Sequence, residues 1–417
     1  MLDINFIKEN KETVKKAAKD KNREIDIERL LEVDKLRREL ITKVEKIRSE
    51  RNILSKSKTI TEEAREKGKK LKKEITLLDE ELKRTETEFL NLMYQVPNIP
   101  DKSVPVGPDA SFNKEVKKWG EIPEFNFKPM DHIALCNKLD LFDLERGSKI
   151  AGFRGYFLKN EAALMEMGIL AHTFKKLVNK GYTPLIAPSL VREFTLFGNG
   201  QFPWGKEEVY LMEKDNLYLA GTAEVPVTAY FSGETLSVKE LPKKFVAFSA
   251  CFRREAGSYG KDTKGLYRLH QFNKIEQVII NKNDYEGSLK LHEELLHNSE
   301  EVLQDLKLPY RVMLMSTGDM GEPQIKKYDV ETYMPSRKGY GETMSNSFMG
   351  DFQTRRLNIR YRNDKGMTEY THSLNNTAVA SPRILIAILE NYQQNDGSVV
   401  VPEILREYVG ADVINPK

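Results

Sequence analysis

Two stretches near the start of the chain carry hydrophobic residues at three- and four-residue steps, the spacing of a helix that packs one face against another helix. The first stretch contains Val33, Leu36, Leu40, Val44, Ile47 and Leu54, and the second contains Leu71, Ile75, Leu78, Leu82, Phe89 and Leu92. Between them lies the polar segment 55–64, in which Thr61 can cap a second helix whose first turn holds Glu62 and Glu63. The pattern predicts an antiparallel helical hairpin.

The distribution of proline and glycine separates this hairpin from the rest of the chain. All 17 prolines lie at or after Pro97, and Gly68 is the only glycine before Gly107. The segment VPNIPDKSVPVGPDA (96–110) reads as an extended linker or the start of a new domain. Beyond it, β-branched runs alternate with amphipathic helical patterns and turns. We therefore expect a helical arm with its linker over residues 1–110 and an α+β domain over residues 111–417.

Composition excludes several classes of protein. No run approaches the roughly 18 apolar residues that a membrane span needs, and the N-terminus is charged from Asp3 onward, unlike a secretory signal. Cys136 and Cys251 are the only cysteines, which supports neither a disulfide framework nor a cysteine zinc site. These features predict a soluble, cytoplasmic protein without zinc and without a membrane partner.

The net charge of +3 is concentrated in the arm. Residues 1–110 hold 26 basic and 23 acidic side chains, which leaves 40 of each sign in the remainder. Within residues 51–73 there are nine basic and three acidic side chains. Lysine and arginine displace counterions from phosphates, so this cluster fits a nucleic-acid contact. A solvated helix face has the same composition, and the charge pattern alone leaves both interpretations open.

The segment 252–276, FRREAGSYGKDTKGLYRLHQFNKIE, lies between two apolar runs at 245–252 and 274–281 and therefore reads as two strands joined by a polar loop. Its charged and aromatic side chains recur at short spacing: Arg253, Glu255, Arg268, Phe272 and Glu276. Arginine grips phosphate through a planar fork, and an aromatic ring offers a stacking face to a base. The segment is a candidate nucleotide site, although arginine–glutamate pairs also occur as structural ion pairs.

This segment resembles the second signature of the class II aminoacyl-tRNA synthetases, in the form found in seryl-tRNA synthetases. Three other segments resemble further motifs of that family in the same order: GYTPLIAPSLV (181–191, with Pro188), GTAEVP (221–226) and HSLNNTAVASPRILIAILENYQQNDGSVVVPEIL (372–405). The family also begins with a helical hairpin, so the resemblance spans essentially the whole chain. Several motifs in one order are far more specific than any single one.

The resemblance implies an α+β catalytic domain of the class II type, an antiparallel β-sheet flanked by helices, with an N-terminal antiparallel coiled-coil arm. It implies an ATP-dependent ligase that forms seryl-adenylate from L-serine and transfers serine to the 3′ end of tRNA(Ser), and of tRNA(Sec) where present. Mg²⁺ would accompany ATP. The first signature implies a homodimer, and the arm would hold the long variable arm of the tRNA.

Residue by residue, the family implies an arginine clamp on ATP. Arg253 would contact the α-phosphate and the serine carboxylate, Arg383 would hold the γ-phosphate, and Glu342 with Ser345 would bind the magnesium. Glu255 and Arg268 would keep the nucleotide bent, with Phe272 under the adenine. The implied ATP-binding set is Arg253, Arg254, Glu255, Arg268, Leu269, Phe272, Glu342, Thr343, Met344, Ser345 and Arg383, of which Arg253 and Arg383 are also the implied catalytic residues. Arg254 is given no separate chemistry.

Serine is too small to be selected by apolar contact, so buried partners for its hydroxyl and ammonium must provide the specificity. The implied serine-binding set is Thr222, Ala223, Glu224, Glu276, Asn375 and Thr377. Two other hypotheses stay open. One is an enzyme of the same fold that activates another amino acid or charges a carrier protein, and the other is a non-catalytic RNA-binding or scaffold protein. The intact Arg253, Glu255, Glu276 and Arg383 argue against loss of activity. His270 and His372 are interpreted as structural.

Overall fold

The protein is described by a computed structural model that covers residues 1–55, 61–258 and 265–417. Its chain forms two compact units, Met1–Pro97 and Asn98–Lys417. Each unit has its own buried core. No helix in the described ranges is long and apolar enough to cross a membrane.

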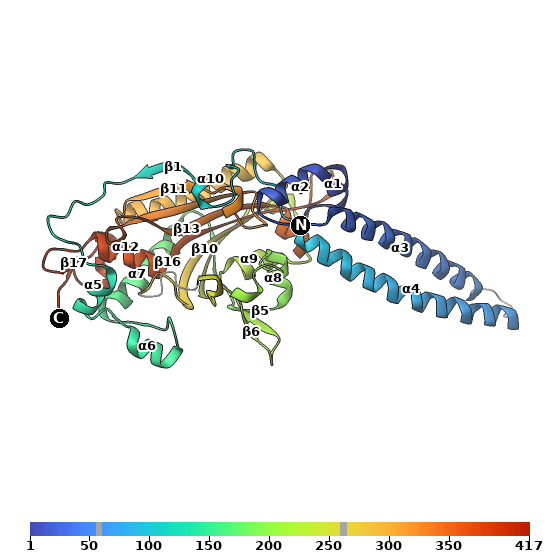
Figure 1. The fold of residues 1–417 in the computed structure, drawn as a ribbon, viewed down its shortest axis with the longest axis horizontal. Helices are drawn as coiled ribbons and strands as arrows, with labels where there is room; N and C mark the ends of the chain where they lie inside the picture. Colours follow the sequence, from blue (N-terminus) through green and yellow to red (C-terminus); the bar gives the residue numbers. More distant parts are fainter. Residues whose placement is uncertain (56–60, 259–264) are drawn as a thin grey trace. The chain divides into compact units, whose positions relative to one another are not determined.

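The N-terminal unit is an antiparallel helical hairpin preceded by two short helices, α1 (Ile4–Glu9) and α2 (Lys11–Asp20). Its long helices are α3 (Ile27–Ser55) and α4 (Glu62–Gln95), which lie side by side (Figure 1). Their buried seam consists of Leu40, Val44, Ile47, Leu71, Ile75 and Leu78. Ion pairs join the two helices in antiparallel order, Arg29 to Glu88 at 2.6 Å and Arg48 to Asp79 at 2.8 Å. The predicted hairpin is therefore confirmed.

The start of α4 follows the sequence prediction closely. The Thr61 hydroxyl accepts a hydrogen bond from the Ala64 amide at 3.3 Å, as an N-cap does. Most of the predicted turn, residues 56–60, lies outside the described residues. One break was not predicted: α2 ends before α3 begins, and Asn22 adopts a positive φ of 57° between them. Asparagine tolerates this left-handed conformation better than most residues, which ends the helix without glycine or proline.

The prediction that Leu36 lies in the buried seam is wrong. Leu36 is 42% exposed, whereas its neighbour Arg37 is turned toward the partner helix with its guanidinium 4.4 Å from the centre of the Phe89 ring. The buried positions before and after it are Val33 and Leu40. Alternating steps of four and three residues from Val33 to Leu40 reach position 37, so the face that meets α4 contains the arginine.

The second unit is built on an eight-stranded sheet in the order β1-β11-β12-β13-β16-β10-β9-β4. Neighbouring strands are antiparallel, except that β4 runs parallel to β9. The strands are β1 (Lys114–Trp119), β4 (Thr183–Ile186), β9 (Lys243–Phe252), β10 (Gln271–Asn281), β11 (Tyr310–Leu314), β12 (Lys326–Met334), β13 (Gly339–Gly350) and β16 (His372–Ala380). This confirms the predicted antiparallel sheet, including the strand pair β9 and β10 on either side of the candidate nucleotide segment.

The smaller elements complete this unit. Its other helices are α5 (His132–Leu139), α6 (Leu144–Ala151), α7 (Asn160–Asn179), α8 (Glu193–Asn199), α9 (Glu224–Thr228), α10 (Tyr285–Asp305), α11 (Phe352–Leu357), α12 (Ser381–Asn391) and α13 (Arg406–Val409). Its short strands are β2 (Phe142–Asp143), β3 (Phe157–Leu158), β5 (Leu190–Val191), β6 (Tyr210–Met212), β7 (Leu217–Leu219), β8 (Thr235–Ser237), β14 (Arg360–Arg362), β15 (Thr368–Tyr370), β17 (Val399–Val400) and β18 (Val413–Ile414).

Alternation along β10 gives the sheet two different faces. Ile275 and Ile279 are buried in the large core cluster that also contains residues of α7, α10 and α12. Val278 belongs to a separate cluster with Ala223, which precedes α9. Because successive side chains of a strand point to opposite faces, Lys274 and Glu276 lie on the side of Val278, away from the helical core. That side carries the candidate site.

From Asn98 onward, the proline-rich segment belongs to the second unit and is hydrogen-bonded to other parts of it. The Asn98 side chain donates to the carbonyls of Pro323 and Met349 at 2.9 and 2.8 Å. Farther along, the Gly318 amide donates to the Gly107 carbonyl at 2.8 Å. These bonds fix where the chain enters the sheet unit.

Candidate active site

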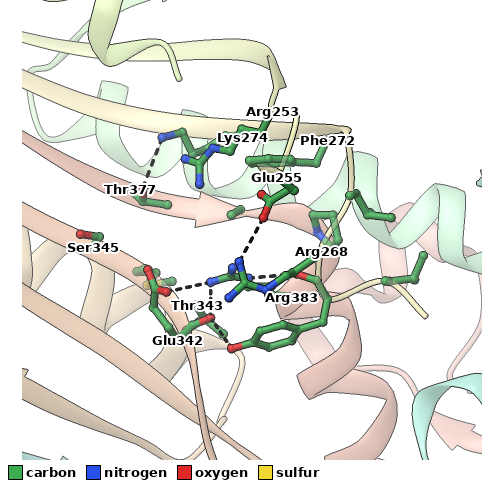
Figure 2. Close-up of a pocket in the computed structure, with 16 residues that line it drawn as sticks. Arg253, Glu255, Arg268, Phe272, Lys274, Glu342, Thr343, Ser345, Thr377 and Arg383 are labelled. Carbon is green, nitrogen blue, oxygen red and sulfur yellow. Dashed lines mark hydrogen bonds and ion pairs between the residues drawn. The ribbon is translucent and has the colours of Figure 1, made fainter. Parts of the chain in front are cut away.

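A pocket on the sheet brings together most of the predicted site residues (Figure 2). Its walls come from the end of β9, the segment leading into β10, the middle of β13, the end of β16 and the start of α12. The predicted residues that line it are Arg253, Glu255, Arg268, Leu269, Phe272, Glu342, Thr343, Met344, Ser345, Thr377 and Arg383. Segments far apart in sequence therefore meet in one cavity.

Arg253 follows directly after β9. Its backbone amide donates to the His270 carbonyl at 2.9 Å, which closes the β9–β10 hairpin. Its Nε donates to the Gly221 carbonyl at 3.3 Å, and its guanidinium lies 5.4 Å from the centre of the Phe272 ring. Arg253 forms no ion pair with a carboxylate in the described parts of the chain. Its positive charge is therefore available to an anionic ligand.

Glu255 and Arg268 form an ion pair across the mouth of the same hairpin, with Arg268 Nη1 3.0 Å from Glu255 Oε2. Glu255 adopts a positive φ of 54°, a conformation that costs energy in a residue with a β-carbon. Such strain is typical of backbone that must aim a side chain in one direction. Arg254, which lies between Arg253 and Glu255 in the sequence, is exposed. It donates to the Glu207 carbonyl at 3.1 Å and does not line the pocket.

The segment 265–270, which leads into β10, is held in place by contacts with His132. Gly265 has a φ of 75°, and a β-carbon there would lie 2.1 Å from His132 Nε2, so only glycine fits. The next amide, of Leu266, donates to the same His132 nitrogen at 3.2 Å. The other ring nitrogen of His132 lies 3.2 Å from Glu390 Oε1 on α12. Residues 259–264 of the predicted loop lie outside the described residues.

Arg383 lies in the first turn of α12 and points into the pocket (Figure 2). Its Nη1 donates to the Glu342 carboxylate at 3.1 Å and to the Glu342 carbonyl at 2.9 Å, while its Nε donates to the Tyr267 carbonyl at 3.2 Å. Burial acts to raise the pKa of Glu342, but Arg383 and Lys327 outweigh it and hold that pKa below its usual value. A cation at a helix N-terminus is unfavourable, and the carboxylate of Glu342 offsets this cost.

A β-bulge gives Glu342 and Ser345 the same orientation. Residues three apart on a regular strand point to opposite faces, but the β12–β13 register shifts after Glu342, so Val330 pairs with Met344 and Thr343 is the extra residue. Glu342 and Ser345 consequently both line the pocket. The Thr343 hydroxyl instead bonds the Thr332 hydroxyl at 2.7 Å, inside the sheet.

A carboxylate not identified from the sequence lies beside this pair. Asp329 on β12 is directly opposite Ser345 in the register and is only 5% exposed. Lys327 Nζ donates to Asp329 Oδ2 at 3.0 Å, while Asp329 Oδ1 has no hydrogen-bond partner among the described residues. Burial and the neighbouring Glu342 raise the pKa of Asp329 to about 6, although Lys327 opposes them. Glu342, Ser345 and Asp329 together form a cluster of hard oxygen donors of the kind that Mg²⁺ prefers.

The inner end of the pocket is polar and is centred on Lys274, which sequence reasoning also missed. Lys274 is 4% exposed, and its Nζ donates to the Thr222 hydroxyl at 2.6 Å and to the Thr377 hydroxyl at 3.4 Å. It also forms an ion pair with Glu276, which is 1% exposed. A signal was present in the sequence: Lys274 and Glu276 are two residues apart on one strand and therefore share a face.

Of the predicted serine-binding residues, Thr377 lines the pocket, whereas Thr222, Ala223, Glu224, Glu276 and Asn375 lie behind its lining. Glu224 Oε1 accepts hydrogen bonds from the side-chain amides of Asn199, Gln353 and Asn375 at 2.9, 2.8 and 2.8 Å. Burial and the nearby Glu276 raise the pKa of Glu224, although its amide donors and Lys274 oppose the change. Ala223 is fully buried and packs against the sheet. Asn199 and Gln353 carry no motif and could not be found from the sequence.

The two histidines within the motifs take part in packing. His372 is buried with its Nδ1 2.9 Å from the Ser288 hydroxyl. His270 packs edge-on against Phe153 and Tyr210. The described residues contain no group of three or more His, Cys, Asp or Glu placed to hold a metal ion by themselves.

Comparison with known proteins gives one consistent result. Residues 209–392 match the tRNA synthetase class II core domain (G, H, P, S and T), and residues 1–100 match the Seryl-tRNA synthetase N-terminal domain. The serine–tRNA ligase of Deinococcus radiodurans is 46% identical, with 98% of both chains covered. That of Rubrobacter xylanophilus is 40% identical, covering 100% of this chain and 99% of its own.

Solved structures agree. The seryl-tRNA synthetase of Pyrococcus horikoshii, crystallised with ATP, matches with a TM-score of 0.90 at 35% identity and complete coverage of both chains. The cytoplasmic serine–tRNA ligase of Naegleria fowleri, in complex with AMP, matches with a TM-score of 0.87 at 32% identity, covering 100% of this chain and 99% of its own. By sequence and by fold, the chain belongs to the seryl-tRNA synthetase family.

Proposed function

We propose that this protein is a serine–tRNA ligase that forms seryl-adenylate from L-serine and ATP and then transfers serine to the 3′ end of tRNA(Ser), and of tRNA(Sec) where that tRNA is present. The observation that carries the proposal is the composition of one pocket. Its outer part holds Arg253 and Arg383 on separate walls, and its inner part holds Lys274 and Thr377, whose ammonium and hydroxyl both contact the buried Glu276. A triphosphate and a small zwitterion fit these two parts respectively.

Binding of ATP uses the outer part. Arg383, held by Glu342, is placed for the γ-phosphate, and the Glu255–Arg268 pair flanks the bend of the nucleotide. The ring of Phe272 offers a stacking face to adenine, with Arg253 beside it. Leu269 and Met344 supply apolar contact at the same level. These roles rest on the positions of the side chains around the cavity.

The first chemical step is an in-line displacement. One serine carboxylate oxygen attacks the α-phosphorus of ATP, a P–O bond forms, and the bond to the bridging oxygen breaks, so that pyrophosphate leaves with the electron pair. Arg253 contacts both the carboxylate and the α-phosphate and neutralises charge that develops between them. No side chain needs to act as a covalent nucleophile, because alignment of the two substrates lowers the barrier. In the second step the terminal ribose hydroxyl of the tRNA takes the seryl group and AMP leaves.

Magnesium would be held by Glu342 and Ser345, with Asp329 behind them. The bulge in β13 directs both residues to one face, and the buried Asp329 Oδ1 is left without a hydrogen-bond partner in the described part of the chain. This oxygen set fits a hard cation that keeps some of its water ligands. When bound, the ion neutralises phosphate charge and polarises the bonds of the triphosphate. Glu342→Gln should raise the Mg²⁺ concentration needed for half-maximal exchange; an unchanged requirement would remove Glu342 from the site.

The arm is proposed to bind tRNA. Seven basic residues of the 51–73 cluster are described, and all are exposed and free of ion pairs among the described residues: Arg51, Arg65, Lys67, Lys69, Lys70, Lys72 and Lys73. The other two, Lys56 and Lys58, lie outside the described residues. Elsewhere on the hairpin, Arg29 and Arg48 are paired with acids of α4. Unpaired cations at one end of a helical hairpin suit contact with phosphates by shape and charge.

Self-association is proposed for the sheet unit. The edge strand β4 exposes Ile186 by 83%, and α7, which contacts β4, exposes Met167 by 65%. Edge strands and apolar side chains of this kind are usually covered in the working assembly. A homodimer formed through the β4 edge would cover these apolar side chains. Sedimentation of an Ile186→Glu variant as a monomer would support this dimer, and an unchanged sedimenting mass would contradict it.

Two further assignments belong to this proposal. Residues 1–110 would form the tRNA-binding region with its linker, and residues 111–417 would form the catalytic domain. The cytoplasm is the proposed compartment, because translation takes place there and because the two cysteines, Cys136 and Cys251, are both buried and unpaired, as in reducing surroundings.

The decisive experiment is amino-acid-dependent exchange of labelled pyrophosphate into ATP. Serine should support exchange far better than alanine, threonine or glycine, and purified tRNA(Ser) should then be charged. An enzyme of the same fold with another substrate would show exchange with a different amino acid. A protein that only binds RNA would show none, and either result would contradict the proposal.

A further inference from the structure

The ammonium of Lys274 is fully satisfied inside the pocket. An ammonium has three donors and no acceptor, and Lys274 Nζ meets three oxygen groups: the hydroxyls of Thr222 and Thr377 and the carboxylate of Glu276. These partners come from three segments that are distant in sequence. The Thr377 hydroxyl in turn donates to Glu276 Oε2 at 3.3 Å. Lys274 therefore connects Thr222, Thr377 and Glu276, and Figure 2 shows its bond to Thr377.

The charges in this region balance only when Lys274 is counted. Lys274 forms an ion pair with Glu276, and both charges act on the pKa of the buried Glu224, which Glu276 raises and Lys274 lowers. With both carboxylates ionised, two carboxylates and one ammonium leave a single negative charge. The amino acid brings one ammonium to meet it, while its carboxylate goes to Arg253. Without Lys274, two buried negative charges would face one positive charge, which is costly in a site removed from water.

The same contacts restrict the orientation of the groups that read the substrate hydroxyl. A free threonine side chain rotates among three rotamers, and a free glutamate among many more. Bonds from one buried ammonium hold Thr222 and Thr377 in single rotamers and fix one oxygen of Glu276. The remaining lone pairs then point in set directions. Rejection of alanine depends on this rigidity, because acceptors that cannot turn to one another stay unpaired when the hydroxyl is missing.

We propose that Lys274 is a specificity-determining residue of the amino-acid pocket, which holds the surrounding oxygens in place to receive the ammonium and hydroxyl of serine. It acts through its neighbours and is a positioning residue. The inference rests on the proposed function, because serine is the substrate that this function assigns to the pocket.

The test compares Lys274→Met and Lys274→Arg with a matched control, Lys282→Met, in the full-length protein. Lys282 directly follows the same strand, is half-exposed and, among the described residues, forms its one ion pair with Asp284. Pyrophosphate exchange is measured with serine and with alanine, and the KM for ATP is measured in parallel. We expect both Lys274 variants to lower kcat/KM for serine and to reduce the serine-to-alanine preference about tenfold, the value of one lost buried contact of roughly 1.4 kcal/mol. The KM for ATP should stay within about twofold, and the control should match the wild type.

Each outcome decides the matter. An unchanged serine-to-alanine preference would show that Lys274 is structural and would overturn the proposal. Tighter serine binding by Lys274→Met, measured by calorimetry, would also overturn it, because the ammonium would then be a competitor of the substrate. If Lys274→Met does not fold, Lys274→Arg decides, since it keeps the charge but replaces a compact ammonium by a planar fork. Failure of the wild type to use serine would instead reject the proposed function and leave these contacts to be tested with the amino acid that it does use.

Discussion

At the scale of single residues, the two arginines of the pocket differ in how they are held. Arg383 is already neutralised by Glu342 and braced by the Tyr267 carbonyl. Arg253 is held through one carbonyl, that of Gly221, and has no carboxylate partner among the described residues. An arginine that is positioned but not neutralised is the one whose full charge can act on a transition state. Arg253 is therefore the side chain on which the chemistry should depend most.

The Arg253→Ala variant tests this directly. Serine-dependent pyrophosphate exchange should fall by about 10² to 10³, the cost of removing one donor from a site of developing charge. The fold should be retained, because Arg253 contributes one hydrogen bond of its side chain to the protein. Circular dichroism and the melting temperature report on folding. An Arg311→Ala variant, which changes an arginine of β11 paired with Glu331 at 2.6 Å, is the control. Normal exchange by Arg253→Ala would exclude this residue from catalysis.

At the scale of elements, α12 carries one residue of the pocket at its start and a buried carboxylate that supports the surrounding segments near its end. Arg383 lies at its start, and the fully buried Glu390 lies near its end. Glu390 accepts hydrogen bonds from the backbone amides of His132 and Ser336, both at 3.0 Å, and from the Ser336 hydroxyl at 2.8 Å. His132 then holds the Leu266 amide beside the pocket. Helix α12 thus supports two walls of the site at once.

The contribution of Glu390 to stability should depend on pH. Burial acts to raise its pKa, but hydrogen bonds from His132 and Ser336 outweigh burial and lower the pKa below its usual value. A carboxylate whose pKa is depressed by folding stabilises the protein above its unfolded pKa and loses this effect as the pH falls through the folded value. Glu390→Gln should therefore reduce the free energy of unfolding at pH 7, by about 1–3 kcal/mol for hydrogen bonds to a charged group.

This difference between Glu390→Gln and the wild type should shrink as the pH falls below about 4, near and below the ordinary range of glutamate. Urea unfolding followed by tryptophan fluorescence measures it, since the two tryptophans, Trp119 and Trp204, both belong to the unit Asn98–Lys417. A destabilisation that is the same at pH 7 and at pH 3.5 would indicate lost packing and not a lost ionised acceptor.

The sequence predicts the positions of helices and strands better than the register in which the strands pair. Proline distribution and helical periodicity were sufficient to predict α3 and α4, and the apolar runs to predict β9 and β10. The bulge at Thr343 was not predictable, because one extra residue in a ladder leaves no signal in composition. That bulge decides whether Glu342 and Ser345 share a face. Lys274 was missed for a related reason: its partners Thr222 and Thr377 are close only after the sheet has formed.

The family motifs were sufficient to predict most residues of the outer pocket, whereas contacts made by residues outside the motifs could not be predicted. Asp329 lies on a strand with ordinary alternation, and its Oδ1, which has no hydrogen-bond partner among the described residues, faces Ser345 only once β12 is paired with β13. In the hairpin, the spacing of hydrophobic residues predicts Leu36 in the buried seam. In the structure Leu36 is exposed, and Arg37 packs against Phe89 instead. Long amphipathic side chains can cover apolar surface, so charge alone does not place a residue outside a helix interface.

At the scale of the whole molecule, the two units carry different kinds of chemistry. The residues proposed for ATP and serine all lie within Asn98–Lys417, and the basic cluster of residues 51–73 lies within Met1–Pro97. Each unit has a separate hydrophobic core. Adenylate formation and tRNA binding should therefore be separable by removing one unit, and they should respond differently to salt.

Deletion of residues 30–95 should leave serine-dependent pyrophosphate exchange near the wild-type rate and abolish charging of tRNA(Ser). The pocket keeps all its residues, whereas the exposed cations that neutralise phosphates are lost. In the intact protein, kcat/KM for tRNA should fall steeply as salt rises from 50 to 200 mM, because counterions released on binding oppose association, while the KM for serine should change little. Replacing Lys69, Lys70, Lys72 and Lys73 by serine should reduce both tRNA affinity and its salt dependence without affecting exchange. A deleted protein that charges tRNA normally would show that the arm is not the tRNA-binding element, and the four exposed lysines would then serve only to keep the hairpin in solution.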